Sequence, residues 1–199
     1  MDDPPRAHLC GFPFSGTDAA LPALEPRLEA FLSRGDPPVV VGLGTSVRNL
    51  GAQILPEAAR ACLEAGHRVV LIGTELPGLP ERAFSLRAAP YSAVFPRALA
   101  IVHHGGVGTT AEAMKAGKPT VIVPFASDQH DNALLAERAG VSVTLARRDL
   151  TAKGLGMALR RLLGSSDHAA SAASLGERIR AEGDGAVVAA KRVVEFAAG

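Results

Sequence analysis

Short apolar segments rich in β-branched residues alternate with segments of helical pattern along most of this chain. The apolar segments are three to six residues long and mostly continuous, as in strands that are buried on both faces of a sheet. Strands that alternate with helices pair in parallel, and the helices then cover both faces. The expected fold class is therefore α/β, a Rossmann-like, doubly wound parallel sheet of six strands with helices on both faces.

The pattern also places the individual elements. Strands are expected at residues 39–44, 69–72, 84–86, 100–102, 120–123 and 141–145. Helices are expected at residues 24–32, 50–65, 109–116 and 128–139, with a helical turn at 94–97 and an all-helical tail at 150–196. Right-handed crossovers put the first and fourth strands beside the point where the strand order reverses. Ligands of such sheets bind outside the carboxyl ends of the strands at that point, so the loops after these two strands are the expected site.

Charge and cysteine content exclude several classes of protein. The chain has 21 Lys and Arg residues against 20 Asp and Glu residues, whereas a general nucleic-acid binder has a basic surplus, so no nucleic-acid partner is expected. Cys10 and Cys62 are the only cysteines, too few for a disulfide framework or a thiolate metal set, and a reducing, cytoplasmic setting is the default. No signal peptide or membrane span is expected, because the longest apolar stretches reach only about half of the ~20 residues that a span needs.

The strongest chemical signal is the glycine-rich segment at residues 103–112, HHGGVGTTAE, between the fourth expected strand and the next helix. Glycines let the backbone approach a ligand closely, and the N–H groups and dipole of a helix N-terminus attract anions. A phosphate or diphosphate is the natural ligand of such a turn. The alternative interpretation is a tight turn in which Thr109 or Thr110 is only a helix cap.

Three side chains of this segment have distinct expected roles. His104 can donate a hydrogen bond to a phosphate oxygen. His103 points the opposite way along a strand and is expected to be structural. Glu112 lies on the following helix, where it can accept hydrogen bonds from vicinal hydroxyls such as those of a ribose, or be an ordinary solvated carboxylate.

Two further segments follow strands. Residues 124–132, PFASDQHDN, lead into a helix that Asp128 can cap, and Asp128 and Gln129 together offer acceptors and donors suited to sugar hydroxyls. Residues 42–46, GLGTS, fall short of the dinucleotide fingerprint because Val47 occupies its last glycine position.

The order and spacing of these residues resemble the donor-binding signature of glycosyltransferases with the two-domain GT-B fold, which include UDP-glucuronosyltransferases, plant glycosyltransferases and bacterial antibiotic glycosyltransferases. The resemblance is carried by His104-Gly105-Gly106, Thr109, Glu112, Gly117-Lys118-Pro119, Pro124 and Asp128-Gln129. The His-His-Gly-Gly-x-Gly-Thr-Thr variant is particularly similar to bacterial antibiotic, sterol and rhamnolipid-type enzymes. A looser resemblance covers nearly the whole chain, and residues 11–14 look like the linker that enters the C-terminal domain.

The resemblance implies a role for each matching residue. The donor diphosphate would be surrounded by Ser46, His104, Gly105, Gly106, Gly108 and Thr109. The ribose would be held by Glu112, the sugar hydroxyls by Asp128 and Gln129, and the base would lie by Pro90 and Tyr91. Ala88 stands where plant members have a base-stacking Trp, and residues 94–96 lack a second His found there in plant members, so uracil and thymine remain alternatives.

The same resemblance implies the function of the chain. Residues 1–22 are expected to be interdomain linker and residues 23–199 the donor-binding domain with its C-terminal helices. The full enzyme would transfer a hexose from a UDP- or TDP-sugar to a hydroxyl of a small molecule, with inversion and without a metal or cofactor. An N-terminal domain, absent from this sequence, would bind the acceptor, supply the catalytic base and carry any peripheral membrane association. The chain alone is then expected to bind donor without transferring sugar.

Other functions remain as alternatives. The chain can be a naturally separate donor-binding subunit of a split two-chain glycosyltransferase. A nucleotide-sugar epimerase of similar fold needs carboxylates that are not evident here. A dinucleotide-dependent oxidoreductase lacks the complete glycine fingerprint and an acidic residue that ends the second strand, where Gly73-Thr74 precedes Glu75.

Overall fold

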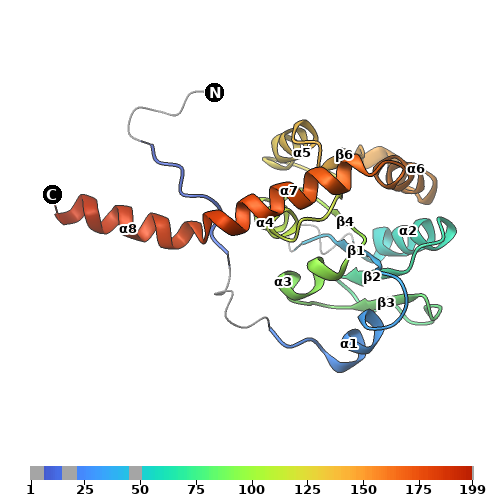
Figure 1. The fold of residues 1–199 in the computed structure, drawn as a ribbon. Coiled ribbons are helices and arrows are strands. Elements are labelled where there is room, and N and C mark those ends of the chain that lie inside the picture. The colour runs from blue at the N-terminus through green and yellow to red at the C-terminus, as the bar shows by residue number, and fades with distance from the viewer. Residues whose placement is uncertain (1–6, 15–21, 45–50, 199) are drawn as a thin grey trace.

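The computed structural model describes residues 7–14, 22–44 and 51–198, with side chains in the last range from residue 54. Its centre is a parallel sheet of six strands in the order β3-β2-β1-β4-β5-β6 (Figure 1). The strands are β1 (Val39–Gly42), β2 (Val69–Ile72), β3 (Ala83–Leu86), β4 (Ala100–His103), β5 (Thr120–Ile122) and β6 (Ser142–Thr144). The α/β, doubly wound fold expected from the sequence is confirmed.

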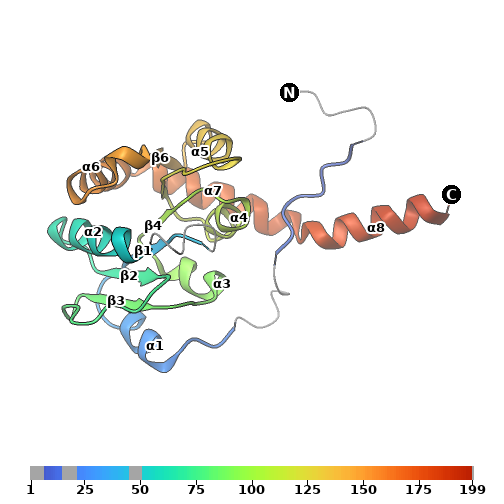
Figure 2. The same cartoon turned by 180° about the vertical axis from the view of Figure 1, so that it is seen from behind.

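Helices connect the strands, except for the loop between β2 and β3, and cover both faces of the sheet (Figures 1 and 2). They are α1 (Pro26–Leu32), α2 (Gly51–Glu64), α3 (Tyr91–Val94), α4 (Val107–Lys115), α5 (Gln129–Arg138), α6 (Ala152–Leu163), α7 (Asp167–Glu182) and α8 (Gly185–Ala198). Two short 3-10 helices, η2 (Phe95–Arg97) and η3 (Arg147–Asp149), follow α3 and β6. The tail expected to be helical is thus three successive helices, and α4 begins two residues before the expected position at Thr109.

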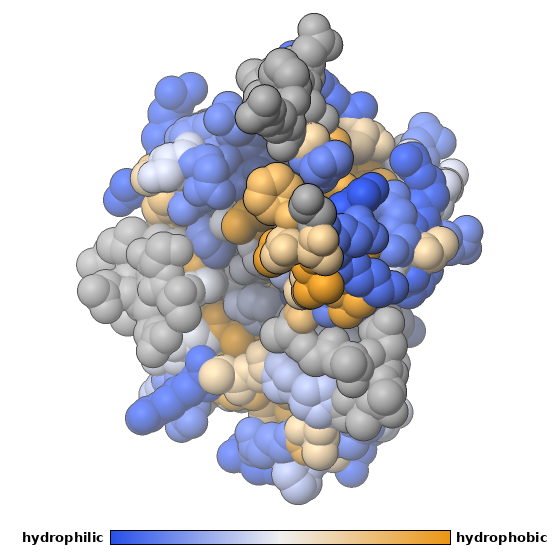
Figure 3. Space-filling view, turned by 90° about the vertical axis from the view of Figure 1, so that its left-hand side faces the viewer, coloured by the Kyte–Doolittle hydropathy of each residue, from blue (hydrophilic) through white to orange (hydrophobic). Residues whose placement is uncertain are grey.

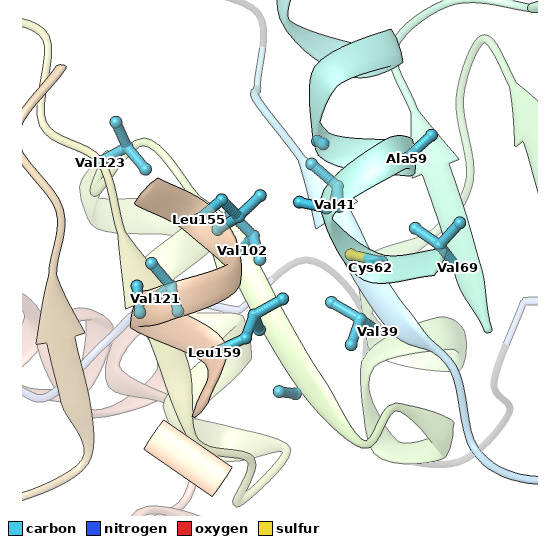
Figure 4. Close-up of a cluster of buried hydrophobic side chains, with 14 of the residues drawn as sticks. Val39, Val41, Ala59, Cys62, Val69, Val102, Val121, Val123, Leu155 and Leu159 are labelled. Carbon is cyan, nitrogen blue, oxygen red and sulfur yellow. The ribbon is translucent and has the colours of Figure 1, made fainter. Parts of the chain in front are cut away.

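Alternate residues of the strands face the two helical layers, because successive side chains of a strand point to opposite faces. On one face, Val39, Val41 and Val102 pack with side chains of α2 and α6 such as Cys62 and Leu159 (Figure 4). On the other face, the strands pack against α1, α3, η2 and α4, and α5 and α7 cover β5. Clusters of buried apolar side chains therefore lie on both faces of the sheet.

The strand order reverses between β1 and β4, as the sequence predicts. These strands are hydrogen-bonded neighbours, and Gly42 at the end of β1 pairs in register with His103 at the end of β4. The two glycine-rich loops that follow them therefore start side by side. This brings segments that are far apart in the sequence to one edge of the sheet.

The described part of the N-terminal segment, residues 7–14, lies across the junction of α7 and α8. Gly185 N donates to Phe12 O at 2.9 Å, and Phe14 N donates to Asp184 Oδ1 at 3.3 Å. Beyond this junction, α8 projects away from the sheet (Figures 1 and 2). In the ranges that the structure describes, no helix is both long and apolar enough to cross a membrane.

Candidate functional site

A cavity of about 660 Å³ opens at the carboxyl ends of the strands, where the order reverses. Four parts of the chain form its walls: the N-terminal segment, the ends of β1 and β2, the β3–α3 connection and the first turns of α4. The described lining residues are Pro13, Pro22, Gly44, Ile72, Gly73, Arg87, Ala88, Ala89, Pro90, Tyr91, Ser92, Gly108, Thr109 and Glu112. The cavity thus gathers several of the residues that the sequence singled out.

His104 is held between two glycines at the edge of this cavity. A Cβ atom on Gly44 or on Gly106 would overlap the imidazole ring, so only glycine fits at both positions. His104 is 4% exposed. Burial lowers the pKa of His104 below its usual 6.5, while the carboxylate of Asp128 acts in the opposite direction. At neutral pH the side chain is therefore a neutral imidazole, which can donate one N–H to an anion.

His103, the last residue of β4, is fully buried, in agreement with its expected structural role. Its Nδ1 accepts a hydrogen bond of 3.1 Å from the backbone N–H of Gly105. Burial, with a smaller contribution from the neighbouring His104, lowers its pKa to about 3. The proton of the neutral ring is therefore on Nε2, which has no hydrogen-bond partner within the described residues.

The N-terminus of α4 faces the same site. Its first backbone hydrogen bond runs from Thr110 N to Gly106 O at 2.9 Å, so the three preceding N–H groups have no partner within the helix. Among the described residues, no side chain caps this helix, and the Thr110 hydroxyl donates back to Gly106 O at 3.0 Å. The alternative in which Thr109 or Thr110 caps the helix is therefore not observed. Gly108 and Thr109, in the first turn of α4, line the cavity.

Tyr91 forms part of the cavity wall next to Pro90. Its ring stacks on Phe95 with 4.4 Å between centroids and 13° between planes. A Cβ atom on Gly42 would lie 2.8 Å from the Tyr91 hydroxyl, so the end of β1 packs directly against this side chain. Burial raises the pKa of Tyr91, and a backbone hydrogen bond at Gly44 acts in the opposite direction. One face of the ring is thus occupied, and the role of Pro90 and Tyr91 beside a base stays a prediction.

Asp128 ends the loop before α5 and Gln129 is the first residue of this helix; neither is among the described residues lining the cavity. Asp128 is exposed and stands at the N-cap position of α5, but its side chain makes no capping hydrogen bond, contrary to the capping interpretation. Its Oδ2 instead accepts a hydrogen bond of 2.9 Å from Asn132 Nδ2. Gln129 is buried, and its Oε1 accepts hydrogen bonds from the backbone N–H groups of Phe125 at 2.8 Å and Ala126 at 3.3 Å. The side-chain oxygen of Gln129 therefore holds the loop before α5.

Asn132 is a residue of this site to which sequence reasoning assigned no role. Its amide also donates to the backbone oxygen of Gly105 at 2.9 Å, which ties the loop before α5 to the loop before α4. The one local signal is its position four residues after Asp128, on the same side of the helix. The contact with Gly105 spans 27 residues and has no signal in the sequence.

Two further expectations concern Ser46 and a metal ion. Ser46, expected at the diphosphate, lies outside the described residues. In the described ranges, no group of three or more His, Cys, Asp or Glu side chains has the arrangement of a metal site.

The fold is that of the C-terminal domain of a GT-B glycosyltransferase, and the comparisons with known proteins identify the same class. The family described as "Erythromycin biosynthesis protein CIII-like, C-terminal domain" matches residues 67–199, and the chain belongs to this family. Among curated relatives, O-mycaminosyltylonolide 6-deoxyallosyltransferase of Streptomyces fradiae is 35% identical over 185 residues, which cover 91% of this chain and 43% of that protein. Vancomycin aglycone glucosyltransferase of Amycolatopsis orientalis is 35% identical over 180 residues, 86% of this chain and 42% of the relative. The chain thus spans less than half the length of these relatives.

Solved structures are similar over the same part of the chain. Spinosyn forosaminyltransferase SpnP superposes with a TM-score of 0.77 at 25% identity, over 89% of this chain and 48% of that one. Glycosyltransferase VinC, solved in complex with DTDP, superposes with a TM-score of 0.73 at 27% identity, over 89% of this chain and 46% of that one.

Proposed function

We propose that this chain is the donor-binding domain of a glycosyltransferase and binds a nucleoside-diphosphate sugar at the carboxyl ends of β1 and β4. The observation that carries the proposal is the geometry around His104. The imidazole is fitted between Gly44 and Gly106 at the edge of a cavity of about 660 Å³. The N-terminus of α4, with three N–H groups that have no partner within the helix, opens at the same place. Helix amides and a neighbouring N–H donor form an arrangement suited to a diphosphate.

Each of the other site residues binds a different part of the donor. The diphosphate contacts the backbone at Gly105, Gly106 and Gly108 and the hydroxyl of Thr109, together with His104 and Ser46. Glu112, which lines the same cavity, accepts hydrogen bonds from the ribose hydroxyls. Pro90 and Tyr91 lie beside the base. Asp128 and the amide group of Gln129 bind hydroxyls of the transferred sugar.

In the proposed reaction, a base from a separate acceptor-binding domain removes the proton of an acceptor hydroxyl. The hydroxyl oxygen attacks the anomeric carbon, the bond to the diphosphate oxygen breaks, and a nucleoside diphosphate leaves with inversion at the sugar. The amides of α4 and His104 stabilise the negative charge that develops on the leaving group, which replaces a metal ion or other cofactor in this role. This domain alone therefore binds donor and transfers no sugar.

The proposed donor is a TDP- or UDP-hexose, and the proposed acceptor is a small molecule with a hydroxyl group. The complex of VinC with DTDP and the names of the curated relatives, which include an aglycone glucosyltransferase, support this choice. Membership of a glycosyltransferase family favours this function over the epimerase and oxidoreductase alternatives.

Calorimetric titration with TDP, UDP and their glucose conjugates tests the proposal. We expect binding of at least one of these ligands, and a loss of about tenfold or more in affinity in His104→Ala, since a hydrogen bond to a charged group is removed. His67→Ala is the matched control, because His67 precedes β2 at the opposite end of the sheet. Absence of binding up to millimolar ligand, or equal affinities of His104→Ala and the unsubstituted chain, contradicts the proposal.

A further inference from the structure

Gly105 is held at both of its backbone polar atoms by side chains from two different elements. Its N–H donates to Nδ1 of His103 at the end of β4, and its oxygen accepts from Nδ2 of Asn132 on α5. Its φ of +88° is favourable only for glycine. A Cβ atom here would lie 2.9 Å from Ile122 Cγ2 and 3.0 Å from Gln129 O, so the peptide is also enclosed by packing. The loop before α4 therefore has one defined conformation at this residue.

The amide group of Asn132 has two acceptors, and both distances are 2.9 Å. One acceptor is the backbone oxygen of Gly105 and the other is the carboxylate oxygen Oδ2 of Asp128. Neither acceptor can donate in return, so both contacts require the NH₂ end of the side chain, with one hydrogen for each. The orientation of the Asn132 amide is thus determined by its partners, and the amide bridges the two loops.

The loop that carries Asp128 needs such support. Ser127, the residue before it, has a φ of +54°, a conformation that costs free energy for a residue with a side chain. Gln129 Oε1 holds the start of this loop through the N–H groups of Phe125 and Ala126. The Asn132 amide connects the Asp128 carboxylate to the loop before α4. The position of this carboxylate relative to the amides of α4 therefore depends on Asn132.

We propose that Asn132 is a positioning residue that fixes the sugar-binding carboxylate of Asp128 relative to the diphosphate-binding loop. The sugar and the diphosphate of one donor molecule can then be bound at the same time. This inference rests on the proposed function, because it assigns Asp128 and the loop at Gly105 to the two ends of the donor. Asn132 itself need not contact the ligand.

Binding of two probes by the full chain separates positioning from a general structural effect. TDP reports on the diphosphate loop and the nucleoside contacts but not on Asp128, whereas TDP-glucose reports on these contacts and Asp128 together. In Asn132→Ala we expect the affinity for TDP-glucose to fall about tenfold more than the affinity for TDP, the effect of one charge-assisted hydrogen bond. Asp131→Ala is the matched control, because Asp131 is exposed and one position earlier on the same helix.

A double-mutant cycle tests whether Asn132 acts through Asp128. Asp128→Ala in the unsubstituted background lowers the affinity for TDP-glucose by the full contribution of the carboxylate. In the Asn132→Ala background the same substitution has a smaller effect, because the carboxylate is already displaced. Equal effects of Asp128→Ala in both backgrounds contradict the inference.

Amide hydrogen exchange of the ligand-free chain provides a readout that does not depend on binding. We expect Asn132→Ala to accelerate exchange in residues 103–110 as well as in residues 125–131, and Asp131→Ala to leave both unchanged. Acceleration confined to residues 125–131 contradicts the bridge between the loops. If the unsubstituted chain binds TDP and TDP-glucose but Asn132→Ala keeps their affinity ratio, this inference alone is wrong. If the unsubstituted chain binds neither probe, the proposed function is wrong and this inference with it.

Discussion

The space that the side chain of His104 occupies is created by glycines from two loops. Gly44 follows β1 and Gly106 follows β4, and a Cβ atom at either position would overlap the imidazole. At Gly108, only two residues further on, an added Cβ atom would meet no neighbouring group within 4 Å. The three glycines therefore serve different purposes, the first two for packing and the third for access to the cavity.

This difference predicts opposite effects of two neighbouring substitutions. Gly106→Ala forces His104 or its loop to move, and we expect thermal unfolding at a lower temperature together with weaker TDP binding. Gly108→Ala is its matched control for the fold, since alanine at this helical position stabilises by roughly 0.5–1 kcal/mol. Differential scanning calorimetry of both variants checks this. Equal melting temperatures for Gly106→Ala and Gly108→Ala would show that the packing of His104 does not require Gly106.

Buried His103 predicts how the stability of the fold depends on pH. Its pKa is about 3 in the folded chain and close to the usual 6.5 when unfolded, so between these values the unfolded chain binds more protons. Stability is therefore fully present above pH 6.5 and is lost as the pH falls toward 3, by ~1.4 kcal/mol for each pH unit. The free energy of unfolding measured in urea should be about 2 kcal/mol lower at pH 5 than at pH 7 because of His103.

His103→Asn keeps a side-chain acceptor for the N–H of Gly105 and removes the titrating group. We expect the pH dependence of its unfolding free energy between pH 7 and 5 to be flatter by that amount. His8→Asn is the control, because His8 is exposed. An unchanged slope in His103→Asn would show that another group causes the loss of stability in acid.

At the scale of elements, α6 is an amphipathic helix that packs against the sheet through its apolar face. Leu155, Leu159 and Leu162 are each at most 1% exposed and pack with α2 against one face of the sheet. Figure 4 shows Leu155 and Leu159 in this cluster. Met157, on the same helix, is 51% exposed. The side chain of Thr151 accepts a hydrogen bond of 3.1 Å from Gly154 N and caps the start of α6. Helix and strands thus share one apolar layer.

We expect Leu159→Ala to destabilise the fold by ~2–5 kcal/mol, because it removes a fully buried side chain and leaves a cavity. Met157→Ala, on the exposed side, should change the unfolding free energy by less than about 0.5 kcal/mol. Chemical denaturation of both variants provides the comparison. Similar losses in the two variants would mean that α6 is not anchored through its leucine face.

At the scale of the whole molecule, α8 differs from the other helices. It projects from the sheet, and its end faces the viewer in Figure 3, where apolar residues in orange lie at the centre of this face. Val193, Val194 and Phe196 are 67%, 68% and 91% exposed. By contrast, Ile179 on α7 is 7% exposed and lies close to the body of the domain. The stability of the domain therefore resides in the sheet and in α1 to α7.

Simultaneous Val193→Ser, Val194→Ser and Phe196→Ser should leave the thermal unfolding of the chain nearly unchanged, since exposed substitutions have effects within about 0.5 kcal/mol each. Ile179→Ser, which places a hydroxyl in a buried position, should cost more than ~2 kcal/mol. Circular dichroism during heating checks both. A large loss of stability in the triple variant would show that α8 folds back onto the domain in solution.

Periodicity and local composition predicted much of this molecule. The strands, the helices and the glycine-rich turns follow from patterns within a few residues, because strand burial, helix spacing and turn chemistry are local properties. The parallel pairing and the reversal between β1 and β4 follow from the alternation of these elements and from the right-handed crossover rule. The structural role expected for His103 followed from the alternation of side chains along a strand, and the residue is fully buried. The start of α4 was misplaced by two residues, because Gly106 and Val107 carry no signal for a helix start that competes with two threonines.

The contacts that decide the site come from the tertiary structure alone. The ring of His104 packs against Gly44 from the loop after β1, and the oxygen of Gly105 accepts a hydrogen bond from Asn132. The Gln129 oxygen accepts hydrogen bonds from the backbone of the preceding loop. Each of these depends on where the ends of β1, β4 and β5 meet in space. The sequence by itself determined the sheet and the identity of the loops that meet at its edge. Only the packing of those loops against one another, which joins residues distant in the chain, decided which atoms remain available to a ligand.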